Sequence, residues 1–265
     1  MIRNIISSHS IRDNTYLEFK SLTPMTITPN YTNTGITLQY SLDKVTWNNI
    51  TAKAVTPSAN VIYFRGSAVG TKRLFTAVHP ANAWIFTGAT NLEAIGNINM
   101  LIQDVLGGNI EDIPLATYCY NYMFQDCTSL VTAPTLPATT LATYCYSSMF
   151  QNCTSLTTAP ALPATTLAAR CYDGMFRNCA SLVTVPALPA TTLPANCYNN
   201  MFQNCGKIKI STTKVGSYIN EYRVPTVGTG IVGTNSLANM FIGTGGTFKG
   251  TPTINTTYYT ENTVV

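Results

Sequence analysis

The sequence predicts a mainly β protein with short helices, in which a small N-terminal antiparallel β-sandwich precedes a repeat solenoid with degenerate terminal caps. Two observations lead to this prediction. Residues 17–80 hold short stretches of alternating apolar and polar side chains, which is the period of half-buried strands. Residues 119–222 then repeat one 26-residue unit four times. A fixed period of this size is typical of a solenoid, whose units bury their apolar faces by stacking on one another.

The N-terminal region divides into an arm and a group of strands. Residues 1–16 are polar and have no strand pattern, so we expect an arm that orders on docking. The stretch ITLQYSLDKVTWNNI alternates from Ile36 to Leu42, and its DK dipeptide predicts a hairpin tip. YLEFKSL, MTITPN and VIYFRGS predict further strands, about five in all, which favours a small sandwich over residues 17–80. The boundary is expected around VHPANAW.

The repeat region consists of the units 119–144, 145–170, 171–196 and 197–222. The length of one unit lies within the 20–29 residues of a leucine-rich-repeat coil. Apolar side chains recur in register and predict core ladders, among them Leu130, Leu156, Leu182 and Ile208, and Phe124, Phe150, Phe176 and Phe202. Within a unit, SLTTAP predicts a short strand that ends at Pro160. The segment CYSSMFQNC predicts a helix of one or two turns that ends at Asn152.

Weaker copies of the repeat lie on both sides of these four units. IFTGATNLEAIG (85–96) matches MFQDCTSLVTAP (123–134) in its Phe, Thr and Leu positions. Residues 81–118 are therefore expected to form a degenerate capping repeat that carries an insertion. NMFIGTGGTFKGTP (239–252) resembles NMFQNC, so residues 223–265 are expected to form the C-terminal cap. Atypical terminal units protect the exposed edges of a solenoid.

The repeat motif CYxxMFxNCTSLTTAPxLPATTLAxx resembles the BspA-like leucine-rich repeat of surface proteins from gut anaerobes and of phages that infect them. LQYSLDKVTW followed by VIYFRG is similar to the sandwich that often precedes such repeats. The resemblance covers residues 17–252 and implies a non-catalytic surface or adhesion role, without a defined ligand. Members displayed on bacteria generally carry an export signal or a lipoprotein cysteine. The N-terminus shows neither, and a phage structural protein needs none.

Each repeat contains two cysteines, and their spacing bears on whether they do chemistry or packing. C-x7-C is not zinc spacing, and the repeats contain no histidine, so no metal or cofactor is expected. Neighbouring rungs stack about 4.8 Å apart, a separation that a disulfide allows. Because pairing would distort a regular ladder, we favour free thiols that pack in the core. This core ladder comprises Cys119, Cys127, Cys145, Cys153, Cys171, Cys179, Cys197 and Cys205.

The positions that vary between repeats suggest where a ligand binds. Variable positions of a solenoid are expected to face solvent along one edge, and Tyr and Arg are common contact residues. The candidate binding residues are Asn121, Tyr122, Tyr144, Arg170, Asp173 and Asn196. The alternative is ordinary drift of exposed residues. The invariant tyrosines Tyr120, Tyr146, Tyr172 and Tyr198 form either a binding stripe or, as we favour, rungs at the core margin whose hydroxyls reach water.

Composition and motifs argue against several function classes. The net charge of +4 is spread thinly, without the basic cluster of a nucleic-acid-binding protein. The sequence contains no run of 18 apolar residues, so it predicts no membrane-spanning helix. The two histidines, His9 and His79, lie outside the repeats, and no catalytic constellation is readable, so we expect no enzyme.

The leading hypothesis is a non-enzymatic phage virion surface protein: a fibre, decoration or tail component. Its N-terminal region would dock on other virion proteins, and its solenoid would attach to a glycan or protein of the host surface. The alternatives are a bacterial cell-surface adhesin, a purely structural virion spacer and a carbohydrate-active enzyme, because paired carboxylates are invisible in sequence. Homo-oligomerisation stays open, since no heptad run is present.

Overall fold

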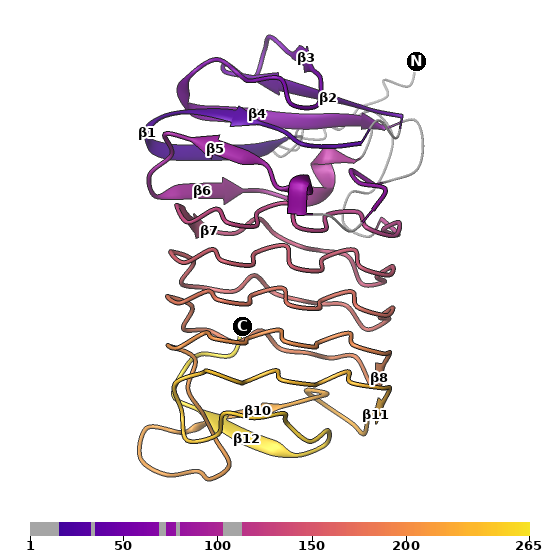
Figure 1. Cartoon of the computed structure of the whole chain (residues 1–265), viewed down its shortest axis with the longest axis vertical. Helices are drawn as coiled ribbons and strands as arrows, with labels where there is room; N and C mark the ends of the chain where they lie inside the picture. Colours follow the sequence, from indigo (N-terminus) through magenta and orange to yellow (C-terminus); the bar gives the residue numbers. More distant parts are fainter. Residues whose placement is uncertain (1–15, 33–34, 69–72, 78–79, 103–112) are drawn as a thin grey trace, which may run out of the picture.

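A computed structural model describes residues 16–32, 35–68, 73–77, 80–102 and 113–265. The protein is mainly β, as predicted. Within these ranges the only helical elements are two short 3-10 helices, η1 (Pro80–Asn82) and η2 (Ile98–Leu101). The strands of the N-terminal part lie at one end, the repeats are layered beneath them, and a second group of strands closes the other end (Figure 1). Except for Tyr16, the predicted docking arm lies outside the described residues, as do both histidines.

The N-terminal end is one seven-stranded sheet in the order β3-β2-β4-β1-β6-β7, with β5 paired to β1. Its strands are β1 (Leu17–Thr28), β2 (Ile36–Ser41), β3 (Asn48–Ile50), β4 (Ala59–Ala68), β5 (Ile85–Thr87), β6 (Leu92–Ile95) and β7 (Leu130–Thr132). The pairs among β1 to β4 are antiparallel, whereas β6 and β7 pair in parallel. Because β7 belongs to the first repeat, the sheet continues into the repeat region. The two-layer sandwich stays a prediction.

Each repeat contains a run of consecutive turns, which we call the turn ribbon: residues 118–127, 144–153, 170–179 and 196–205. Its amides alternate between two kinds of partner. The amide of Met149 donates to the carbonyl of Tyr146 within the same turn, at 3.2 Å, and the next amide, of Phe150, donates to Met175 of the next unit, at 3.0 Å. The alternation gives every backbone amide of residues 144–153 a carbonyl partner.

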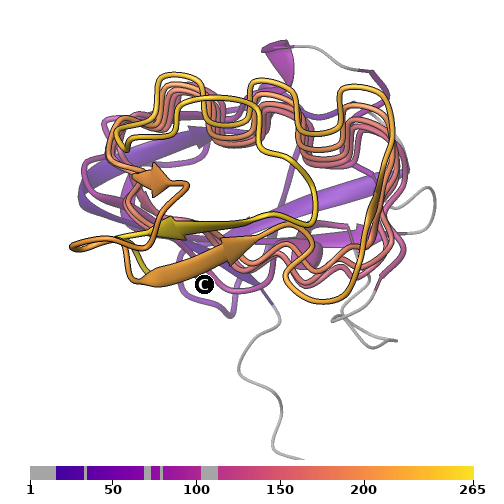
Figure 2. The same cartoon turned by 90° about the horizontal axis from the view of Figure 1, so that it is seen from below.

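The helix predicted for CYSSMFQNC is absent, and that prediction is wrong. Every fourth residue of the ribbon has a positive φ: 58° at Tyr144, 52° at Ser148 and 63° at Asn152. A left-handed residue in each turn interrupts the helical path, and the intervening amides bond to the neighbouring unit. The ribbon therefore runs as a wave, and the waves of successive units superpose when the stack is viewed along its axis (Figure 2).

The rest of each unit contains little regular strand. The strand predicted after the ribbon is β7 in the first unit, and the equivalent SLTTAP segment of the second unit is not a strand. Its contact with the third unit includes the hydrogen bond from the amide of Val183 to the carbonyl of Thr157, at 2.9 Å. The amide of Ala159 also donates to the Thr184 hydroxyl, at 2.7 Å, and these bonds join the segments without forming a ladder.

The weaker copies pack in the register that the sequence matches suggest. Phe86 stacks on Phe124 with ring centroids 5.9 Å apart, and Leu92 pairs with Leu130. At the other end Phe241 stacks on Phe202 at 5.8 Å. Two small sheets complete this end: β10-β12-β9 and β11-β8. Their strands are β8 (Thr192–Leu193), β9 (Ile210–Ser211), β10 (Asn220–Arg223), β11 (Ile231–Val232) and β12 (Thr257–Thr260).

The apolar ladders are buried, and the tyrosine ladder lies deeper than expected. Tyr120, Tyr146, Tyr172 and Tyr198 are at most 1% exposed, and their rings stack 5.7 to 5.8 Å apart. The prediction that these hydroxyls reach water at the core margin is therefore wrong. Two of every four ribbon residues point inward, so Cys-Tyr and Met-Phe enter the core together. The tyrosines lie as deep as the phenylalanines because both follow the same turn geometry.

Candidate functional site

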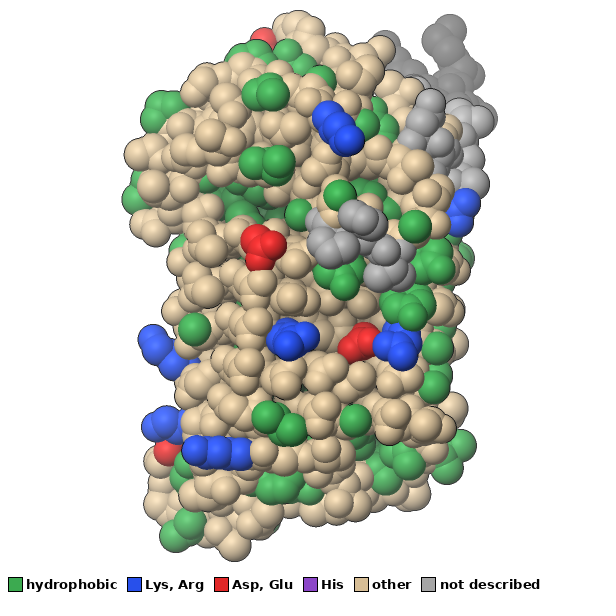
Figure 3. Space-filling view, viewed as in Figure 1, with side chains coloured by type: hydrophobic (Ala, Val, Ile, Leu, Met, Phe, Trp, Pro, Cys, Tyr) green, Lys and Arg blue, Asp and Glu red, His purple; other side chains and the backbone are tan. Residues whose placement is uncertain are grey.

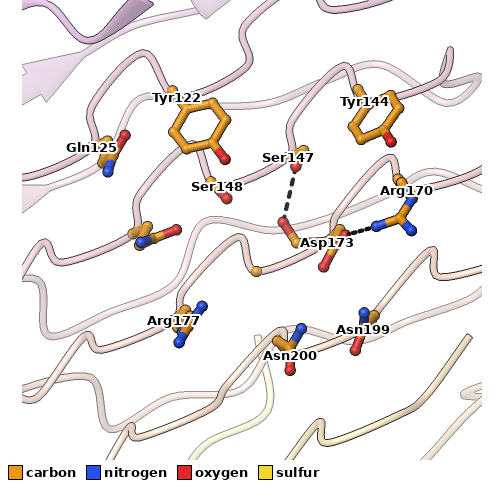
Figure 4. A pocket seen from close by; sticks show the side chains of 12 residues that line it. Tyr122, Gln125, Tyr144, Ser147, Ser148, Arg170, Asp173, Arg177, Asn199 and Asn200 are labelled. Atoms are coloured by element: carbon orange, nitrogen blue, oxygen red, sulfur yellow. Dashed lines mark hydrogen bonds and ion pairs between the residues drawn. The ribbon is translucent and has the colours of Figure 1, made fainter. Parts of the chain in front are cut away.

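A groove of about 460 Å³ opens on the outward side of the turn ribbons and spans all four of them (Figure 4). It is lined by Tyr122, Gln125, Tyr144, Ser147, Ser148, Gln151, Arg170, Asp173, Gly174, Arg177, Asn199 and Asn200. Tyr122 and Tyr144 lie on one side of it, and Arg177, Asn199 and Asn200 lie on the opposite side (Figure 4). The lining is rich in amide, hydroxyl and guanidinium groups, which suits a polar ligand.

The groove exists because the side chains at one left-handed position differ in size. Tyr122, Ser148, Gly174 and Asn200 occupy the same ribbon position in successive units, and all have a positive φ. The two central residues are small, whereas those above and below them are larger. At Gly174 even a Cβ atom would come within 3.3 Å of the Ser148 hydroxyl. Variation at this position therefore opens a hollow in an otherwise regular surface.

An ion pair holds in place Arg170 and Asp173, two of the charged side chains with which the ribbon of the third unit lines the groove. Arg170 Nη1 lies 2.8 Å from Asp173 Oδ2, and the guanidinium sits 5.7 Å from the centroid of the Tyr144 ring. The Asp173 side chain is only 16% exposed. Burial raises the pKa of Asp173 above its usual value, and the hydrogen bond from Arg170 opposes that rise. The contacts fix the carboxylate and the Tyr144 ring relative to each other.

Two acceptors in the lining are buried without a partner among the described residues: Gln125 Oε1 and Asn199 Oδ1. A buried acceptor without a hydrogen bond costs about 1–3 kcal/mol. Both atoms belong to residues that line the groove. Hydroxyl donors from a ligand or from water would remove this cost.

Arg177 is the exposed cation of the groove. It forms no ion pair within 4.0 Å with any residue that the structure describes, whereas Arg170 is already paired. Two arginines and one aspartate give the lining a formal charge of 2 − 1 = +1. Charged side chains are few on this face, and most of its surface is uncharged (Figure 3).

Four of the six predicted binding residues line the groove: Tyr122, Tyr144, Arg170 and Asp173. Asn121 does not, because its side chain is fully buried and donates to the carbonyl of Ser147 at 3.1 Å. The expectation that every variable position faces solvent is therefore wrong at Asn121. Asn196 is half-buried and lies outside the lining.

Gln125, Gln151 and Arg177 also line the groove, and the sequence did not single them out. They follow the invariant Phe of each unit, in the FQD, FQN and FRN segments, which vary little between repeats. The signal for Arg177 is present in the sequence, because Gln125, Gln151 and Gln203 occupy the same position in the other units. A single change from Gln to Arg marks the third unit.

The eight cysteines are buried free thiols, and none of them lines the groove. The Sγ of Cys153 donates to the carbonyl of Phe124 at 3.1 Å, and Cys179 and Cys205 repeat this bond at 3.0 Å in the following units. Burial raises the pKa of Cys127 to about 11 and those of Cys179 and Cys197 to about 12. A thiol that stays protonated is a poor nucleophile.

In the described part of the chain, no group of three or more His, Cys, Asp or Glu side chains is arranged to hold a metal ion. Within the same residues, no helix has the length and apolar character needed to cross a membrane.

Comparison of the chain with protein-family models, curated proteins and solved structures finds no match.

Proposed function

We propose that this chain is a non-enzymatic attachment protein whose groove binds a glycan of a cell surface. The observation that carries this proposal is the composition of the groove. Two tyrosine rings offer amphipathic faces, Arg170 and Asp173 offer fixed polar groups, and two buried acceptors lack donors. A saccharide supplies both C–H faces for rings and many hydroxyl donors.

The same lining supports binding over hydrolysis. Glycoside hydrolysis uses a pair of carboxylic groups about 5–9.5 Å apart on either side of the scissile bond. Among the described residues, the groove lining contains one carboxylate, Asp173, which is engaged by Arg170. A carbohydrate-active enzyme is therefore the weaker proposal.

For the fold, we propose a leucine-rich-repeat solenoid of the BspA-like kind preceded by a β-sandwich. The 26-residue period and the hydrogen bonds between successive ribbons support the solenoid. The repeat motif and the LQYSLDKVTW and VIYFRG segments support the family resemblance. In this scheme the repeats are a rigid frame, and the groove comes from the few outward positions that vary.

For the setting, we propose display on a phage virion, with docking on other virion proteins through the N-terminal region. The groove is built from the repeats, so docking through the N-terminal region would leave it accessible. A bacterial cell-surface adhesin would use the same groove, whereas a structural spacer would not need it. Mass spectrometry of gradient-purified phage particles and of host envelope fractions separates the settings. Stoichiometric copies in the particles support the virion, and enrichment only in the envelope supports the adhesin.

The binding proposal is tested with the full chain on a panel of surface oligosaccharides and polysaccharides. We expect wild type to bind a defined subset, and Tyr144→Ala to weaken that binding at least tenfold, because it removes a ring and the support for Arg170. Tyr218→Ala, at a half-buried tyrosine outside the groove, is the matched control and should bind like wild type. Binding that survives Tyr144→Ala, or no binding to the panel or to whole host cells, would overturn the proposal. Sugar release from a bound polysaccharide would support the enzyme instead.

A further inference from the structure

The groove carries a charge that a neutral saccharide would not use. Arg170 is neutralised by Asp173 at 2.8 Å, and this leaves Arg177 as the cation available to a ligand. Arg177 is exposed, and it lies across the groove from Arg170 with Asp173 between them (Figure 4). A planar guanidinium with free donors is suited to bidentate pairing with a carboxylate.

Position 177 also distinguishes the third unit from its neighbours. Gln125, Gln151 and Gln203 occupy the equivalent place in the other three repeats, so glutamine satisfies the packing of the ribbon. The arginine is therefore not required by the fold. It lies beside the small residues Ser148 and Gly174, where the groove has room for a ligand.

We infer that the groove selects an acidic saccharide, with Arg177 pairing to a sugar carboxylate while Tyr122 and Tyr144 contact the faces of the sugar rings. This inference rests on the proposed function of the groove. Hydroxyls of the same ligand would donate to Gln125 Oε1 and Asn199 Oδ1, which lack partners among the described residues. Asp173 does not repel the ligand strongly, because Arg170 already compensates its charge.

The test uses matched pairs of oligosaccharides that differ in the carboxylate. Suitable acidic members are oligomers of galacturonate, mannuronate, hyaluronan and sialic acid, each paired with its carboxyl-reduced form. A sulfated galactan oligomer tests whether the groove prefers an anion other than a carboxylate. We expect the full chain to bind at least one acidic member ten times or more tightly than its reduced partner. That preference should shrink as salt rises from 50 to 500 mM, because the pairing is electrostatic.

Arg177→Gln is the decisive variant, since it installs the residue of the other three repeats and should leave the fold intact. We expect a five- to tenfold loss of affinity for the acidic member and no change for its reduced partner. Lys207→Gln, at an exposed cation outside the groove, should change neither. Arg177→Lys should bind the acidic member more tightly than Arg177→Gln but less tightly than wild type, because lysine keeps the positive charge and loses the bidentate guanidinium.

The outcomes separate this inference from the proposed function. Equal binding of acidic and reduced members, lost in Tyr144→Ala, overturns the acidic selectivity and leaves the attachment groove standing. Preference for the sulfated oligomer over every carboxylate also overturns the inference. Binding that neither Tyr144→Ala nor Arg177→Gln affects places the ligand elsewhere and overturns both. No binding to any member overturns the inference, and the proposed function is then decided by binding to whole host cells.

Discussion

The asparagines that precede the last cysteine of the second, third and fourth turn ribbons act through both backbone and side chain. Asn152, Asn178 and Asn204 have φ values of 61° to 63°, a region that Asn tolerates better than most residues. Their amides also bond between units: Asn178 Nδ2 donates to Asn152 Oδ1 at 2.7 Å, and Asn204 Nδ2 donates to Asn178 Oδ1 at 2.9 Å. From the sequence, Asn152 is predicted to end a segment, and the structure adds its place in a ladder of side-chain hydrogen bonds.

Replacing Asn178 separates these two contributions. Asn178→Ala should lower the free energy of unfolding by about 2 kcal/mol, since it forces alanine into a left-handed conformation and removes two hydrogen bonds. Asn178→Gly keeps the conformation and should cost less. Urea unfolding of both variants and wild type measures the difference. Equal losses in the two variants would show that the backbone conformation contributes nothing.

Replacing either of two buried tyrosines by phenylalanine should change stability in opposite directions. Tyr120 donates to the carbonyl of Ile98 at 3.2 Å, whereas the hydroxyl of Tyr146 is buried with no partner among the described residues. Tyr146→Phe should therefore leave stability unchanged or raise it by about 1 kcal/mol, and Tyr120→Phe should lower it by about 1 kcal/mol. Thermal and urea unfolding measure both. A clear loss in Tyr146→Phe would reveal a partner for that hydroxyl.

At the scale of elements, the period of the repeat was predictable and the path within it was not. Leu130, Leu156 and Phe150 identify the ladders because they recur at fixed spacing. The ribbon, however, alternates two inward and two outward residues, a period of four that is close to the helical 3.6 and far from the strand value of 2. A short segment with this pattern resembles a helix, and only the bonds between units decide against one. The same ambiguity hid the burial of Asn121.

Deleting a whole unit tests this account of the ribbon. Removal of residues 145–170 joins Tyr144 to Cys171 and keeps every ladder in register, so the shortened chain should unfold cooperatively with a similar circular dichroism spectrum. Removal of residues 145–157, half a unit, places inward residues at outward positions and should abolish cooperative unfolding. Two deletion variants that behave alike would show that register between units is unimportant. The unit deletion should also lose glycan binding, because it removes Arg170 and part of the groove.

At the scale of the whole molecule, one apolar core runs through the described chain from the N-terminal sheet to the last strands. The ring of Phe19 packs near that of Phe124 in the first repeat, with ring centroids 6.2 Å apart, and Phe241 stacks on Phe202 at the far end. The matches at residues 85–96 and 239–252 predicted where the repeats extend. The sequence could not reveal that β1 pairs with β6, because a pairing between distant segments leaves no local pattern. The groove was predictable only in part, since it depends on which outward neighbours are small.

The buried thiols predict a strong sensitivity to alkaline pH. Burial raises the pKa of Cys127 to about 11 and that of Cys179 to about 12, whereas an unfolded thiol has a pKa of about 8.5. Above that value the unfolded chain releases protons that the folded chain keeps, so unfolding becomes easier as pH rises. Each such thiol contributes a loss of up to about 1.4 kcal/mol per pH unit.

Urea midpoints under reducing conditions, measured from pH 7 to 10, check this prediction. They should be level below pH 8 and fall steeply above pH 9. A level midpoint through pH 10 would mean that the thiols are not buried in the folded protein.

A crystal structure of the full chain with the oligosaccharide that binds it best in solution tests most directly whether outward residues of adjacent turn ribbons form a saccharide site. We expect a sugar over Gly174, with a ring against Tyr144, a hydroxyl bonded to Gln125 Oε1 and a carboxylate paired with Arg177. A saccharide bound on the N-terminal sheet or the C-terminal strands, with the groove free of it, would show that the ribbons do not form this site.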